Sequence, residues 1–321
     1  MISPRRAVAS PSLVPTSPSL EELVALRGAA RGLRLQARRP TQTHYSGSHR
    51  STQRGRGLEF QEVRPYVTGD DPRTIDWRVT ARRGKPHTKL FREERERPVW
   101  LLADLHEGMF FGTRRQLKST VVLRAAALLA WSAALGGDRV GAVVVGTKVP
   151  AVASAGPATY RIIPPRAREA GVLPVLAALL EMQPVAPGPV TDGLSPGLKA
   201  LAPLVHPGSL VLVLSDYATL EERAPEWRAL AVHNEFRLFW VTDPLESSGL
   251  PDGSFRVGLA GRSIALDGAS VRTLWLEKWR ERRARIEALA TDIHAPVTQL
   301  DTGQPVEATL QALLAGRRSA A

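Results

Sequence analysis

The chain has 321 residues, of which 43% are hydrophobic and 23% are charged, a balance typical of a globular protein and not of a disordered one. This length is enough for one large domain or two modest ones. No cysteine is present, which excludes disulfide bonds, a cysteine nucleophile, thiolate-bound zinc and iron–sulfur clusters. No apolar run approaches the roughly 20 residues that span a bilayer, and the N-terminal segment lacks the hydrophobic core of an export signal. We therefore expect a soluble, cytoplasmic protein.

The net charge of +12 is concentrated in the N-terminal third of the chain. Residues 1–100 carry a net charge of +10, whereas residues 201–321 carry −2. Between Glu22 and Glu59 there is no acidic residue, but there are eight arginines: Arg27, Arg31, Arg34, Arg38, Arg39, Arg50, Arg54 and Arg56. Such a basic segment is typical of a surface that meets either nucleic acid or an acidic protein. Because it holds a single aromatic residue for stacking on bases, we favour an acidic protein, and a nucleic-acid-binding module using residues 27–56 is the alternative.

The N-terminal third is expected to contain a tail, a helix, a loop and a β-rich segment. Residues 1–18 are rich in Pro and Ser without periodicity, which predicts a disordered tail. Ser19 offers a helix N-cap with a glutamate three residues later, and the leucines that follow predict a helix to about residue 36. Residues 39–57 are polar and glycine-bearing and predict an exposed loop. Short apolar–polar alternations in residues 58–98 predict strands joined by a turn or a short helix.

The pattern changes at residue 98, where a continuous apolar run predicts a strand that is buried on both faces. Further strands are expected at 139–146, 209–215, 235–242 and 296–301, and helices at 115–136, 169–182, 194–205, 221–233, 270–291 and 305–315. A small hairpin is expected near 243–268. Alternating strands and helices predict an α/β fold, a doubly wound and mostly parallel sheet that is covered by helices on both faces.

Three aspartates follow predicted strands of this sheet: Asp104, Asp216 and Asp243. Ligands of open α/β sheets bind at the carboxyl ends of the strands, where converging carboxylates can hold a hard cation such as magnesium. Acidic residues also follow buried strands as helix caps and turn formers, which is the more common reason for such a position. No phosphate-binding glycine loop, no nucleophile elbow and no histidine pair at zinc-site spacing is present. The sequence therefore predicts no enzymatic activity.

Residues 57–97 interleave acids, bases and aromatic residues more densely than any other segment. They could bury arginine–carboxylate pairs between the sheet and a smaller subdomain, which we favour because buried charges need partners, or they could form a partner-binding face. Twelve residues of the segment stand at fixed spacing: Arg64, Tyr66, Gly69, Asp70, Asp71, Arg73, Asp76, Trp77, Arg82, Glu93, Glu94 and Arg95. Further motifs stand at Met109–Gly112, Lys118–Ser119, Leu128–Trp131, Gly137–Gly141, Ser215–Asp216 and Asp243–Glu246. With them, the chain resembles domain-of-unknown-function family 58 over roughly residues 19–315.

The resemblance implies a von Willebrand factor A-like domain with a small N-terminal β-rich segment. It divides the chain into the tail at 1–18, an N-terminal helix, basic loop and β-rich segment at 19–97, and the von Willebrand factor A-like domain at 98–316. It also implies partners, namely an AAA+ ATPase of the MoxR type and other von Willebrand factor A proteins, with which the chain would act as an adaptor in a chaperone-like assembly. Some relatives carry N-terminal membrane helices, and this chain resembles the short soluble subgroup that does not.

Domains of this kind bind metal through Asp-x-Ser-x-Ser after the first strand, a threonine from a later loop and an aspartate after a further strand. This chain has Asp104, His106 and Gly108 in place of the aspartate and the two serines, so both hydroxyl ligands are missing. Thr191 or Asp192 stands near the position of the threonine, and Asp216 matches the later aspartate. The resemblance therefore implies a degenerate metal-ion-dependent adhesion site without a cofactor. A divalent metal is the weaker alternative, in which His106 would favour a softer ion such as zinc or manganese.

Overall fold

The computed structural model describes residues 17–33, 35, 58–67, 70, 72–93, 96–146, 160–188, 190, 193–259 and 262–315. The chain forms two compact units, which we call the sheet unit, residues 1–40 and 97–321, and the hairpin unit, residues 41–96. Most of the predicted tail and the whole of the predicted loop at 39–57 lie outside the described residues.

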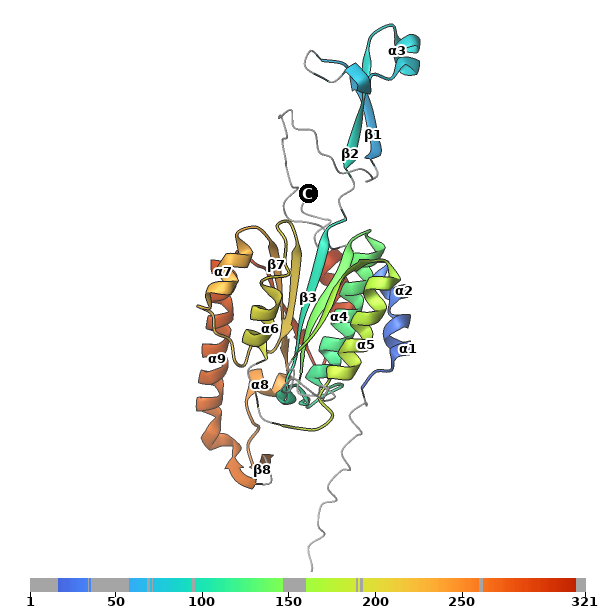
Figure 1. The fold of residues 1–321 in the computed structure, drawn as a ribbon. Helices are drawn as coiled ribbons and strands as arrows, with labels where there is room; N and C mark the ends of the chain where they lie inside the picture. Colours follow the sequence, from blue (N-terminus) through green and yellow to red (C-terminus); the bar gives the residue numbers. More distant parts are fainter. Residues whose placement is uncertain are drawn as a thin grey trace, which may run out of the picture. The chain divides into compact units, whose positions relative to one another are not determined.

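The sheet unit is built on six strands in the order β10-β7-β6-β3-β4-β5 (Figure 1). Their bounds are Pro98–Leu105 for β3, Arg139–Gly146 for β4, Tyr160–Ala167 for β5, Leu210–Ser215 for β6, Glu235–Thr242 for β7 and Val297–Asp301 for β10. All neighbouring pairs are parallel except β4 and β5, which are antiparallel. The chain order reverses between β3 and β6, which confirms the predicted doubly wound, mostly parallel sheet.

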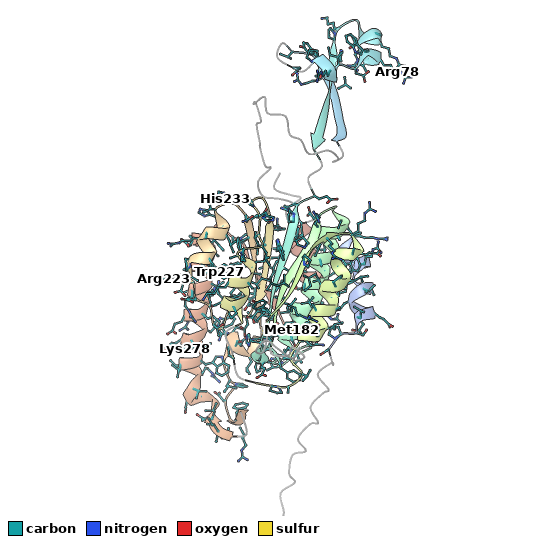
Figure 2. The ribbon with its side chains drawn as sticks, in the orientation of Figure 1. Arg78, Met182, Arg223, Trp227, His233 and Lys278 are labelled. Carbon is teal, nitrogen blue, oxygen red and sulfur yellow. The ribbon has the colours of Figure 1, made fainter. Side chains whose placement is uncertain are left out.

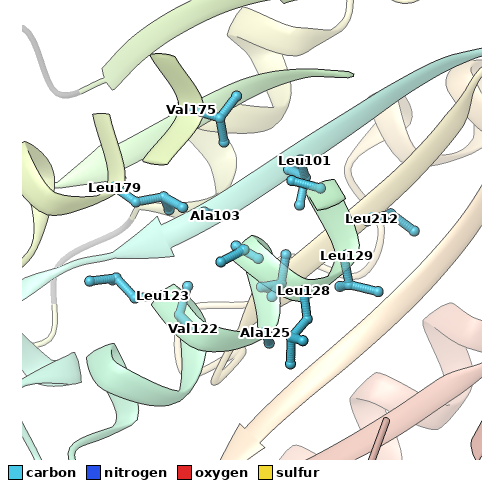
Figure 3. Close-up of a cluster of buried hydrophobic side chains, with 14 of the residues drawn as sticks. Leu101, Ala103, Val122, Leu123, Ala125, Leu128, Leu129, Val175, Leu179 and Leu212 are labelled. Carbon is cyan, nitrogen blue, oxygen red and sulfur yellow. The ribbon is translucent and has the colours of Figure 1, made fainter. Parts of the chain in front are cut away.

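Each face of the sheet packs against its own set of helices. Leu101 and Ala103 of β3 point into the larger core, which Figure 3 shows between the sheet and the helices α4 (Lys118–Leu135) and α5 (Glu169–Met182). The intervening residues of β3, such as Leu102, point into a second core on the other face. That core is closed by α6 (Leu194–Leu201), α7 (Pro225–Ala231) and α9 (Gly268–Asp292). Strands buried on both faces need apolar side chains at every position, which explains the continuous apolar runs in the sequence.

The N-terminal helix differs from its prediction in length and in location. Instead of one helix to residue 36, there are two short ones, α1 (Leu20–Ala25) and α2 (Arg27–Ala30). They lie in the sheet unit, whereas the predicted division placed this segment with the β-rich segment. Leu23 is fully buried, and its carbonyl accepts a hydrogen bond of 3.1 Å from Nε1 of Trp131 on α4. The N-terminal helices therefore pack on α4 through Leu23.

The hairpin unit is the small β-rich segment that the resemblance implied. Strands β1 (Leu58–Pro65) and β2 (His87–Glu93) pair antiparallel, and they are connected through a 3₁₀ turn at Pro72–Thr74 and the helix α3 (Trp77–Arg83). Asp76 caps α3 by accepting hydrogen bonds from the backbone N–H groups of Arg78 and Val79. The helix ends at Gly84, whose φ of 68° suits glycine.

The segment after β7 holds the remaining elements. A short helix, α8 (Pro244–Ser248), is followed by the hairpin of β8 (Ser254–Leu259) and β9 (Arg262–Asp267), which lies within the range predicted for a hairpin. The chain then continues through α9 to β10 and ends its described part with α10 (Val306–Ala315).

Candidate functional site

The carboxyl ends of β3 and β6 meet at the point where the strand order reverses, and they bring Asp104, His106 and Asp216 together. The two strands are neighbours in the sheet, and Asp104 and Asp216 are only 1% and 3% exposed. His106 connects them, because its Nε2 lies 3.3 Å from Oδ1 of Asp216 and its backbone N–H donates to Oδ1 of Asp104 at 3.4 Å. Three of the residues singled out in the sequence, Asp104, His106 and Asp216, thus lie within hydrogen-bond reach of one another.

Asp104 is enclosed by protein on all of its polar sides. Its Oδ2 accepts a hydrogen bond of 2.8 Å from Oγ of Ser215, the last residue of β6. Its Oδ1 lies against the backbone of Gly193, where an added Cβ would stand 2.2 Å away. Burial raises the pKa of Asp104 to about 6, although the neighbouring His106 works in the opposite direction.

His106 is held in one orientation by the residue two positions later. The backbone N–H of Gly108 donates to Nδ1 at 3.1 Å, so Nδ1 carries the lone pair and the proton is assigned to Nε2, which donates to Asp216. A side chain at position 108 would approach the ring to 2.7 Å, which explains why a glycine is needed there. Burial lowers the pKa of His106, but the carboxylates of Asp216 and Asp104 outweigh burial, and the net direction is upward.

Lys118, the first residue of α4, completes the cluster, and the sequence analysis did not identify it as a site residue. Its Nζ donates to Oδ2 of Asp216 at 3.0 Å and to Oε1 of Glu246 at 2.7 Å. Burial lowers the pKa of Lys118, but the attraction of Asp216 and Glu246 outweighs burial and raises it. The pKa of Asp216 is lowered despite burial, chiefly because of the Lys118 ammonium.

Asp243 belongs to a separate hydrogen-bond cluster. It accepts bonds from the backbone N–H and the hydroxyl of Thr113, from the hydroxyl of Thr302 and from the backbone N–H of Leu245. It also forms a capping box with Glu246 at the start of α8. Burial raises the pKa of Asp243, and the bonds from Thr113 and Thr302 lower it by more. For this aspartate the helix-capping interpretation is the one that the structure supports.

The clustered donors do not fit a hydrated divalent cation. Every carboxylate oxygen of Asp104 and Asp216 accepts a hydrogen bond from the protein, and both ring nitrogens of His106 are engaged. Magnesium needs oxygen ligands in octahedral geometry and retains several waters, whereas these buried oxygens are already engaged by hydrogen-bond donors of the protein. Among the described residues, no group of three or more acidic or histidine side chains is arranged to hold a metal. The positions proposed for a third ligand, Thr191 and Asp192, lie outside the described residues.

The hallmark residues of the hairpin unit form a partly buried turn. Arg64 pairs with Asp70 at 2.7 Å, and Asp70 also accepts from the backbone N–H of Val67 and, through its carbonyl, from Oη of Tyr66. This pair lies within the hairpin unit and is partly exposed, so it is not the buried network that we expected between a subdomain and the sheet. The backbone of Glu93 pairs with Leu58 in the hairpin.

Of the other hallmark residues, Asp76 is half-buried and caps α3, and the rest are exposed or fall outside the description. Arg73, Trp77 and Arg82 are exposed. Gly69, Asp71, Glu94 and Arg95, together with the side chain of Glu93, lie outside the described residues.

Only a small part of the basic segment can be placed. Arg27 pairs with Glu169 of α5, and its guanidinium lies 5.4 Å from the ring centroid of Trp131. Arg31 is exposed directly after α2. The other six arginines lie outside the described residues: Arg34, Arg38, Arg39, Arg50, Arg54 and Arg56. The two that are described contribute to packing and to the surface of the sheet unit.

A family model described as "Protein of unknown function DUF58" matches residues 62–292. The chain belongs to this family. The resemblance drawn from the hallmark residues is thereby confirmed. The chain is 27% identical over 304 residues to the uncharacterized protein Mb1516 of Mycobacterium bovis, covering 92% of this chain and 91% of that protein. The same values hold for the uncharacterized protein Rv1480 of Mycobacterium tuberculosis.

Two solved structures resemble the DUF58 chain more distantly. The conserved hypothetical protein BatB from Bacteroides thetaiotaomicron has 12% sequence identity and a TM-score of 0.42, covering 70% of this chain and 100% of that one. An aerotolerance-related membrane protein from Bacteroides fragilis has 12% identity and a TM-score of 0.38, covering 68% and 97%. Within the described part of the DUF58 chain, one helix, α4, is long and apolar enough to cross a membrane by length and composition, and 83% of it is buried inside the protein.

Proposed function

We propose that this protein is a non-enzymatic adaptor that acts with an AAA+ ATPase of the MoxR type in a chaperone-like assembly. The partner class comes from the family resemblance. The observation that carries an interaction function is an exposed tryptophan on the hairpin unit, among exposed cations that pair with no acidic side chain of the described ranges. The cluster at the sheet edge supports the proposal further, because its described polar groups are engaged in hydrogen bonds with one another.

The surface in question consists of five residues of α3 and its C-terminal turn: Trp77, Arg78, Arg82, Arg83 and Lys85. We call it the α3 surface. The side chain of Trp77 is 69% exposed. The four basic side chains are also exposed and form no ion pair within the described ranges, and Figure 2 labels Arg78 among them. The exposed apolar ring and the uncompensated positive charges are the chemistry of a protein-binding surface, because tryptophan and arginine are the residues most enriched in binding hot spots.

The charge of the α3 surface favours an acidic partner. A second copy of the same surface would bring like charges together, which opposes association. Nucleic acid remains the alternative function, since arginine and lysine bind phosphates. Single-stranded nucleic acid is commonly held by several stacking aromatic rings, and the α3 surface offers one. A partner protein with an acidic surface and an apolar pocket would match both the positive charge and the exposed indole ring of the α3 surface.

The adaptor function can be tested with the purified full-length chain and a purified MoxR-type ATPase from the same organism. We expect binding that depends on nucleotide and that weakens at least about 30-fold in Trp77→Ala, the loss of a typical hot spot. Val232→Ala is the matched control, because Val232 is also 69% exposed and lies on the sheet unit. Arg82→Glu and Arg223→Glu form a second matched pair of exposed arginines, of which only the first should weaken binding.

One outcome would contradict the proposal, and another would support the alternative function. The ATPase assignment is wrong if the wild-type chain does not bind the ATPase with ATP, with ADP or without nucleotide. The nucleic-acid alternative gains support if random-sequence DNA or RNA binds at 100 mM salt and the affinity falls steeply as salt is raised.

A further inference from the structure

We propose that the ammonium group of Lys118 replaces the divalent cation at the edge of the sheet, so that the buried carboxylates are neutralised by the chain itself. The observation is the position of Nζ between Oδ2 of Asp216, at 3.0 Å, and Oε1 of Glu246, at 2.7 Å. Asp216 is the residue that matches an aspartate ligand of related domains. This inference concerns the sheet unit alone and does not depend on the proposed partner.

Burial is the first reason why Asp216 needs a cation at this position. The side chains of Lys118 and Asp216 are 3% and 4% exposed, and an unpaired carboxylate so far from water is strongly unfavourable. A bound metal ion or an ammonium group can supply the missing positive charge. Both cannot do so at the same oxygen, because two cations a few ångströms apart repel each other strongly where water is excluded.

The surroundings of the ammonium group give the second reason. Beyond its two carboxylate partners, Nζ lies 5.7 Å from the ring centroid of Phe111, so an aromatic face covers another side of it. Glu246 is itself fixed by its capping box with Asp243 and by an ion pair of 3.1 Å with Arg282 of α9. The lysine therefore links the end of β6 to α8, and through Glu246 to α9, in a fixed arrangement.

The position of Lys118 at the start of α4 explains how its side chain can reach the buried carboxylates. Lys118 begins α4, and all other residues in the first two turns of that helix except Arg124 are buried and uncharged. The long apolar stem of lysine packs with them, while its charged end reaches the sheet edge. A cation attached to the chain is present at all metal concentrations, unlike a bound ion.

The test is thermal unfolding of the full chain with and without divalent metals. We expect the melting temperature to change by less than about 1 °C when EDTA is replaced by millimolar Mg²⁺, Mn²⁺, Ca²⁺ or Zn²⁺, because a ligand stabilises only a state that it binds. A rise of about 3 °C or more with any of these ions, lost in Asp216→Asn, would overturn the proposal. This measurement needs only wild type and one variant.

Variants of the lysine itself test the replacement directly. Lys118→Ala should lower the melting temperature by roughly 10 °C. Propylammonium matches the removed atoms and should restore part of the lost melting temperature. Tetramethylammonium has no N–H donor and should restore none of it. The exposed Lys278 supplies the control Lys278→Ala, with a change below about 1 °C and no response to amines. If Lys118→Ala does not fold, Lys118→Met with Glu246→Gln serves instead. That double variant should lose less stability than the two single variants together, and strict additivity would contradict the proposal.

Discussion

Oγ of Ser215 donates a hydrogen bond of 2.8 Å to Oδ2 of Asp104, which joins the ends of the two central strands β6 and β3. Oγ of Ser215 also accepts a hydrogen bond of 2.9 Å from the backbone N–H of Tyr217. The hydroxyl thus connects a buried carboxylate to the backbone that leaves β6. No residue of this pair is exposed, so its loss cannot be compensated by water.

Ser215→Ala tests this connection. We expect a loss of about 1–3 kcal/mol in the free energy of unfolding, because the Asp104 carboxylate and the N–H of Tyr217 both lose a partner. Urea unfolding followed by circular dichroism measures it. Ser247→Ala, at an exposed serine that bonds a backbone carbonyl in its own helix, should change stability by less than about 0.5 kcal/mol. Equal losses for the two variants would contradict the prediction.

Asp104 should make stability depend on pH in the opposite sense to a salt-bridged carboxylate. Its pKa rises from 3.8 to about 6 on folding because of burial, so the folded state holds the proton more tightly than the unfolded state. Stability from this group is therefore present at low pH and is lost as the pH rises from about 4 to 6. Asp104→Asn has no proton to lose, so its stability relative to wild type should improve by up to about 3 kcal/mol across that range.

Unfolding of wild type and Asp104→Asn in urea at pH 4.5, 5.5 and 7.0 measures this difference. Because Asp104 helps to raise the pKa of His106, part of the difference at pH 7.0 belongs to that histidine, and the step from pH 4.5 to 5.5 isolates Asp104. A difference that stays constant, or that shifts in favour of wild type as the pH rises, contradicts the prediction.

Two glycines should respond in opposite ways to alanine. Gly193→Ala places a Cβ 2.2 Å from Oδ1 of Asp104, and because that carboxylate is buried and hydrogen-bonded, we expect a loss of about 2–4 kcal/mol. Gly28→Ala lies in α2 with nothing within 4 Å of the added carbon, and should be neutral or stabilise the protein by up to about 1 kcal/mol. Denaturant midpoints at constant slope provide the comparison. A neutral Gly193→Ala would show that Asp104 can move freely.

Trp131 should control how firmly the N-terminal segment is held. Trp131→Phe removes the hydrogen bond to the carbonyl of Leu23 and weakens the contact with the Arg27 guanidinium. We expect limited proteolysis within residues 20–33 to become several-fold faster, while the remainder of the sheet unit is cut at its former rate. Trp77→Phe, in the hairpin unit, is the control and should leave that segment protected. Unchanged cleavage in Trp131→Phe would show that the apolar contacts of Leu23 suffice.

The sequence predicted the central strands well and one edge strand not at all. The bounds of β4 and β7 match their predictions because each is rich in apolar and β-branched residues, although β7 also buries Arg237. Strand β5 was missed because it contains Pro164 and Pro165 and exposes most of its side chains, a pattern that does not resemble a buried strand. Its position at the sheet edge is what allows those prolines.

The candidate site was predicted in the same uneven way. The positions of Asp104 and Asp216 follow from the rule that parallel strands present their carboxyl ends at one edge. Lys118 could not be found by that rule, since it begins a helix and its partner Glu246 is 128 residues away. Lys118 stands in one of the motifs that carry the family resemblance and in the first turn of a mostly apolar helix, but neither signal says which carboxylates the ammonium group reaches.

Helix α9 has a length that the sheet does not require. Its 25 residues extend about 38 Å, whereas an eight-residue strand such as β7 extends about 26 Å. Apart from Gly268 at its start, the residues it buries are Ile286, Leu289 and Ala290, near its C-terminal end. The N-terminal half packs instead on α8, where Nε1 of Trp275 donates to the carbonyl of Glu246 at 3.0 Å, and it begins directly after the β8–β9 hairpin (Figure 1). One unbroken helix thus connects the β8–β9 hairpin to Arg282, which pairs with the carboxylate of Glu246 at 3.1 Å.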